Sequence, residues 1–76
     1  MNKEHPMHPS TVAILRYFAY DHLPPHLAAI SRPLAEMAAE MAGKFDGPEL
    51  TAGLRKLLEA KDCFVRAGLT EGAGRD

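Results

Sequence analysis

The longest apolar pattern in the chain lies between residues 25 and 42. Its large hydrophobic residues are three or four positions apart, which is the spacing of one face of an α-helix. They are Leu27, Ile30, Leu34, Met37 and Met41. Alanines at positions 28, 29, 35, 38, 39 and 42 surround this seam, so other helices can approach closely from several sides. The pattern predicts a helix from about Pro25 to Ala42 that packs in an oligomeric bundle.

A second helical pattern covers residues 48–67 and ends at Gly68. Its apolar residues form a wide stripe, and its charges alternate in sign at the spacing of surface ion pairs, as in Arg55–Glu59 and Asp62–Arg66. The stripe consists of Leu50, Leu54, Leu57, Leu58, Phe64 and Val65. Between the helices, Gly43 suits a left-handed residue after the first, and Asp46 or Gly47 suits the N-cap of the second. A short connection of this kind predicts an antiparallel helical hairpin.

A short helix is expected before the hairpin. Ser10 can cap the segment from Thr11 to about Tyr20, and the prolines of the following DHLPP stretch end it. The predicted organisation is a flexible leader at residues 1–9, one helical-hairpin domain at residues 10–69 and a disordered tail at residues 70–76. The expected fold class is all-α, with no strand, in a compact helical homo-oligomer.

Composition supports an association of several copies. A chain of 76 residues is marginally stable without disulfides, metal or oligomerisation, and Cys63 is its only cysteine. We expect Cys63 to be a small buried residue of the last helix. The formal charge of −1 gives no basis for bulk attraction to nucleic acid or membrane. The start lacks a signal peptide and no run is long enough to cross a membrane, so a cytoplasmic protein is predicted.

The titratable residues do not form a recognisable catalytic or metal-binding set. Two of the histidines lie in the leader, at His5 and His8, and two flank a pair of prolines, at His22 and His26. No cysteine or carboxylate cluster completes a zinc site, and no nucleophile has a base at suitable spacing. We therefore expect no enzyme activity, no metal and no cofactor. His22 or His26 is instead a candidate capping or ligand-contacting residue.

Two further functions stay open at this point. The last helix has basic residues that a small DNA-binding regulator would need, but acidic residues alternate with them, which is typical of a solvated surface. A plain helical protein-assembly factor would also fit the apolar patterns. Neither requires a small-molecule site.

Pro33 marks the strongest candidate for such a site. It removes a donor from the middle of the helix, so a bend is expected there, with a polar gap beside Ser31 and Arg32. A guanidinium suits phosphate, and Phe18 and Tyr20 are candidate stacking surfaces for a base. The alternative is that Pro33 is a tolerated bend and that Arg32 simply pairs with Glu36 one turn later.

Two stretches of the chain resemble the helical-hairpin domain of phage anti-CBASS and Thoeris anti-defence proteins. They are YDHLPPHLAAISRPLAEMA at residues 20–38 and LRKLLEAKDCFVRA at residues 54–67. In that family an aromatic and basic segment precedes the first helix, and the second helix ends in a motif like Val65-Arg66-Ala67. Asp21 stands where relatives carry a basic residue, and Pro33 has no clear counterpart.

The resemblance implies a function without catalysis. Small members of the family are sponges that sequester cyclic di- and trinucleotide immune signals in a helical homohexamer, and larger relatives bind signals of the cyclic ADP-ribose type. Tyr20 corresponds to the aromatic residue against a base, Arg66 to the arginine of the motif, and Arg32 to the basic residue near the phosphates. The predicted ligand-binding residues are Phe18, Tyr20, His22, Ser31, Arg32 and Arg66. The protein would then act in the host bacterial cytoplasm, without membrane or duplex nucleic acid as partner.

Overall fold

The computed structural model describes residues 7–72, and within this range the chain is all-helical, as predicted. Its elements are α1 (Pro9–Arg16), α2 (Pro25–Lys44), α3 (Pro48–Ala67) and a final π-helical turn, η1 (Gly68–Gly72). The flexibility expected of the leader before Met7, and of the tail after Gly72, concerns residues outside the described range. No helix of the described residues is long and apolar enough to cross a membrane.

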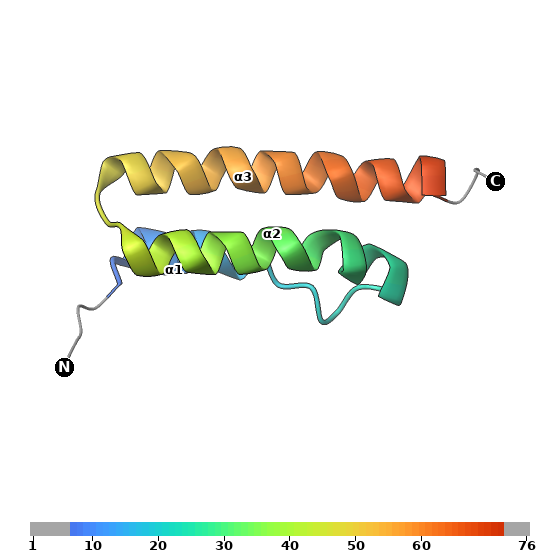
Figure 1. Ribbon diagram of the computed structural model, residues 1–76, viewed down its shortest axis with the longest axis horizontal. Coiled ribbons are helices and arrows are strands. Elements are labelled where there is room, and N and C mark those ends of the chain that lie inside the picture. Colours follow the sequence, from blue (N-terminus) through green and yellow to red (C-terminus); the bar gives the residue numbers. More distant parts are fainter. Residues whose placement is uncertain (1–6, 73–76) are drawn as a thin grey trace.

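The helices lie side by side along one axis. α3 runs back along α2 after the short connection at residues 45–47, and α1 packs against both of them (Figure 1). The far ends of the two long helices also meet, because Gly68 lies directly against the side chains of Leu27 and Ile30. A side chain at Gly68 would meet these two residues, so glycine permits the close approach there.

The core face of α2 differs from the predicted seam. Its buried residues are Leu27, Ser31, Ala38 and Ala42, whereas Leu34 and Met41 are only half-buried. Met37, predicted at the centre of the seam, is 49% exposed. The physical reason is that small residues let α3 approach closely, so alanines face α3 and the larger side chains lie beside the contact.

The segment around α1 completes the core. Phe18, only 2% exposed, packs in one cluster with Ala38, Leu50 and Leu54. Ile14 and Leu15 of α1 and Leu57 and Leu58 of α3 cover this cluster. The predicted stripe of α3 is therefore partly correct, but Phe64 is exposed rather than buried. Cys63, expected to be buried, is exposed as well.

The observed ends of the helices differ from several of the predicted caps. α1 begins at Pro9 and ends at Arg16, and its N-cap is His8 rather than Ser10, because the His8 ring accepts a hydrogen bond from the Ser10 N–H. Gly43 lies inside α2, which continues to Lys44. The left-handed glycine is instead Gly47, with φ 97°, at the N-cap of α3. A residue without a side chain adopts this conformation at little cost.

The end of α3 extends further than expected. Thr70, predicted to begin the tail, lies in η1, and its hydroxyl donates to the carbonyls of Arg66 and Ala67 at 3.2 and 3.4 Å. These bonds tie Thr70 to the last turn of α3. The ordered part of the chain therefore continues past residue 69.

Candidate functional site

Tyr20 lies on a tight turn between α1 and α2. The Leu23 N–H donates to the Tyr20 carbonyl at 3.0 Å, and the Leu23 side chain is half-buried. The Tyr20 side chain is half-buried, and His22 lies on the same turn with its side chain exposed. The turn therefore presents an aromatic and an imidazole side chain within three residues of each other.

Arg32 forms the ion pair with Glu36 that the sequence offered as the alternative to a phosphate site. Its Nε donates to Glu36 Oε2 at 2.9 Å, and both side chains are exposed, by 63% and 60%. The hydrogen bond to Glu36 and the negative charge of that carboxylate raise the pKa of the Arg32 guanidinium above its ordinary value, and Tyr20 contributes in the same direction. Tyr20, twelve positions earlier in the sequence, therefore lies within electrostatic range of Arg32.

Ser31 does not share a gap with Arg32. Its side chain is fully buried, on the face of α2 that meets the core, whereas Arg32 points to solvent. The Ser31 hydroxyl oxygen has no hydrogen-bond partner among the described residues. Ser31 precedes Pro33 by two positions, and α2 continues through Pro33 without interruption.

The remaining predicted residues have different surroundings. Phe18 is a core residue, so neither face of its ring is open to a base in the single chain. Arg66 is exposed in the last turn of α3, where its Nη2 lies 3.5 Å from Cys63 Sγ. The predicted pair of Arg66 with Asp62 is not formed, because Asp62 pairs with the neighbouring Lys61 at 2.9 Å.

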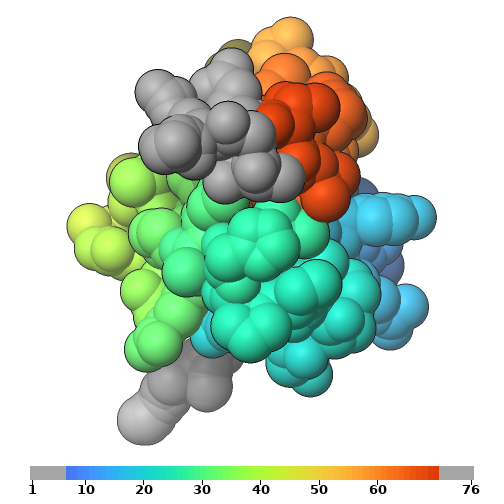
Figure 2. Space-filling view, turned by 90° about the vertical axis from the view of Figure 1, so that its right-hand side faces the viewer, coloured from blue at the N-terminus to red at the C-terminus, as the bar shows by residue number. Residues whose placement is uncertain are grey.

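These candidates still occur at one end of the molecule. The first turns of α2, the turn before them and the last turns of α3 lie together there, as Figure 2 shows in green, light blue and red. The structure brings Tyr20 within electrostatic range of Arg32, and it places His22 and Arg66 on segments of the same end. It separates Phe18 and Ser31 from them, because these two side chains are buried in the core.

An apolar groove runs along the opposite half of the long helices. It has a volume of about 290 Å³ and lies between the end of α2 and the start of α3. Its apolar lining residues are Met37, Met41, Phe45, Leu50, Gly53, Leu54 and Leu57. Met37 and Phe45 are 49% and 56% exposed, so much of this hydrophobic surface faces solvent.

A second hollow, of about 460 Å³, lies between the starts of α1 and α3. The sequence interpretation missed it, because Arg55 was assigned to an ion pair with Glu59 that the described residues do not form. The available signal was an arginine one turn after a threonine near the start of a helix, but its proximity to residues 8–10 is not visible in the sequence.

Metal binding has no evident place in the described range. No three histidine, cysteine or acidic residues of the described part of the chain come together in a way that could hold a metal ion. No family model, curated protein or solved structure matches the chain. The resemblance to the anti-defence proteins therefore stays a prediction from the two quoted stretches.

Proposed function

We propose that the protein is a binding protein without catalytic activity that sequesters a small cyclic nucleotide signal. The ligand class is a cyclic di- or trinucleotide or a cyclic ADP-ribose-type molecule, as the resemblance to phage anti-defence proteins implies. The observation that carries this proposal is the exposed Arg32 guanidinium on α2, within electrostatic range of Tyr20 on the turn before that helix. An aromatic ring beside a guanidinium offers a stacking surface for a base and donors for a phosphate.

The ion pair between Arg32 and Glu36 is compatible with this role. Exposed ion pairs one helical turn apart contribute little to stability, because solvent screens them and both side chains lose conformational freedom. A phosphate oxygen can therefore replace the Glu36 carboxylate as the acceptor of the Arg32 N–H groups. His22 and Arg66, whose side chains are exposed, are further proposed ligand contacts.

Self-association is the second part of the proposal. Within residues 7–72, one chain buries few large apolar side chains: the buried hydrophobic residues there are Phe18, Leu27, Ala38, Ala42, Leu50 and Leu54. The groove around Met37 and Phe45 leaves further apolar surface uncovered. We propose that copies of the chain cover this groove in a homo-oligomer, a hexamer in the form that the resemblance implies, in the cytoplasm of a host bacterium.

The ligand is tested by thermal shift and titration calorimetry of the purified full chain. Cyclic dinucleotides, cyclic trinucleotides and cyclic ADP-ribose isomers are compared with linear nucleotides at equal concentration. A ligand that binds only the folded state raises the melting temperature by mass action. The proposal expects saturable binding of at least one cyclic compound and its recovery unchanged by chromatography. Absence of binding across the panel contradicts it, and a linear product would indicate an enzyme.

The protein-assembly alternative has one observation in its favour, which is the same apolar groove. A helix of another protein could lie between α2 and α3 as a second copy of the chain would. The two cases differ in the isolated protein, because only self-association gives a larger particle without a partner. A folded monomer that binds no cyclic nucleotide would favour the assembly factor.

A further inference from the structure

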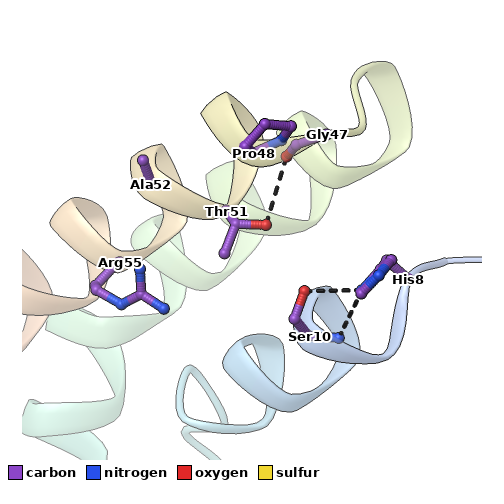
Figure 3. Close-up of a pocket in the computed structure, with 7 residues that line it drawn as sticks. All are labelled: His8, Ser10, Gly47, Pro48, Thr51, Ala52 and Arg55. Atoms are coloured by element: carbon purple, nitrogen blue, oxygen red, sulfur yellow. Dashed lines mark hydrogen bonds between the residues drawn. The ribbon is translucent and has the colours of Figure 1, made fainter.

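The hollow between α1 and α3 is lined by residues from the start of each helix. Figure 3 shows Thr51 and Arg55 of α3 on one side and His8 and Ser10 on the other. Gly47, Pro48 and Ala52 form the rest of its wall. Its volume of about 460 Å³ falls within the usual range of small-molecule pockets. The hollow is thus a recess with polar side chains on two facing helices.

The described lining of the recess carries a positive charge. Among the seven described residues that line it, Arg55 is the one with a permanent charge, and none is acidic. No carboxylate of the described residues pairs with Arg55, in contrast to Arg32, which Glu36 engages. The Arg55 guanidinium therefore has its N–H donors available beside the recess, and a planar fork of donors suits an oxyanion.

The other polar groups add hydrogen-bond donors. The Ser10 N–H donates to His8 Nδ1 at 3.1 Å, and the Ser10 hydroxyl lies 2.9 Å from the same nitrogen. Because Nδ1 accepts, the neutral ring carries its proton on Nε2, which leaves that N–H as a donor. The Thr51 hydroxyl bonds the Gly47 carbonyl at 3.4 Å, which is long, and it can rotate towards an anion.

We propose that this recess binds a phosphate group, with Arg55 as the principal ligand and Thr51 and His8 as additional donors. Donors from two facing helices match the several oxygens of a tetrahedral anion better than the two oxygens of a carboxylate. The group can belong to free phosphate or to a small phosphorylated molecule, whose organic part would lie against Pro48 and Ala52. The site is separate from the proposed nucleotide site, because neither Tyr20 nor Arg32 is among the residues that line the recess.

The test is an NMR titration of the ¹⁵N-labelled full chain with inorganic phosphate, phenyl phosphate and acetate. The phosphate compounds should shift the backbone amides of Ser10, Gly47 and Thr51 along one saturable curve, and acetate should bind more weakly. Tighter binding of phenyl phosphate identifies a phosphorylated molecule as the ligand, and equal binding identifies free phosphate. No saturable shift of these amides up to about 10 mM of either compound overturns the proposal.

Matched variants assign the effect to the recess. Arg55→Gln should weaken phosphate binding about tenfold or more, whereas Lys56→Gln, which removes the same charge from the next residue of α3, should change it less than about twofold. Thr51→Val removes the hydroxyl donor of Thr51 and should also weaken phosphate binding. Equal binding by wild type and Arg55→Gln overturns the site. Arg32→Ala should leave this titration unchanged, so failure here is distinguishable from failure of the nucleotide proposal.

Discussion

Arg32 is the residue on which the nucleotide proposal depends most. Arg32→Ala removes the exposed guanidinium of the proposed site and should weaken binding of a cyclic nucleotide about tenfold or more, as expected for hydrogen bonds to a charged group. The matched control is Arg16→Ala, which removes an exposed arginine from the last turn of α1. Titration calorimetry compares the two. Equal affinity for both variants and the wild type would assign Arg32 to the surface alone.

A substitution of Glu36 tests the same site, but here the affinity for the cyclic nucleotide is expected to rise instead of fall. Glu36→Gln removes the carboxylate that accepts from Arg32 Nε. The amide oxygen of Gln can still accept a hydrogen bond, but without the negative charge it competes less for Arg32 and does not repel a bound phosphate, so affinity for the cyclic nucleotide should rise. Weaker binding in Glu36→Gln would mean that Glu36 holds Arg32 in position for the ligand instead of competing with it.

Ser31 makes a prediction about stability at the residue scale. Its hydroxyl is fully buried and has no partner among the described residues, so it carries a desolvation cost without a compensating hydrogen bond. Ser31→Ala removes that cost and should raise the free energy of unfolding by about 1 kcal/mol in urea denaturation. A decrease would indicate that a ligand or a second chain satisfies the hydroxyl.

At the scale of the helices, two glycines report whether the apolar groove is covered. Gly43 in α2 and Gly53 in α3 both have open space where a side chain would begin, but only Gly53 lines the groove. In an uncovered chain, Gly43→Ala and Gly53→Ala should each stabilise the protein by about 0.5–1 kcal/mol, because alanine favours the helix.

The two alanine variants should differ if a second copy packs closely into the groove. A new methyl group at position 53 would then meet the neighbouring chain, whereas Gly43→Ala would keep its gain. Melting temperatures and particle sizes of both variants, measured at the same concentration, separate the cases. Equal stabilisation with unchanged assembly would exclude close packing at Gly53.

The whole molecule is expected to associate through this groove. Light scattering should give a mass several times the 8.3 kDa of one chain at micromolar concentration. Phe45→Ser should reduce that mass, because Phe45 lies in the groove and is 56% exposed in the single chain. Tyr17→Ser is the control, since Tyr17 is an exposed aromatic residue outside the groove. A stable, well-folded wild-type monomer would contradict the proposed assembly.

Local sequence signals determined the elements of this protein. Spacings of three and four residues predicted the two long helices, and proline and glycine residues placed their boundaries within a few positions. These signals are sufficient because helix formation depends on nearby residues and on the groups that end each helix. The same signals correctly identified Gly47 as one possible cap and Arg32–Glu36 as a possible ion pair.

Tertiary packing decided which side chains face the core and which face solvent. The periodicity of α2 did not specify its rotation, and close contact with α3 placed Ala38 and Ser31 inside while Met37 remained exposed. It likewise buried Phe18, expected as a stacking residue, and brought His8 and Ser10 opposite Thr51 and Arg55. The sequence alone could predict helices because their bonds are local, but the core and both hollows arise from contacts between segments far apart in the chain.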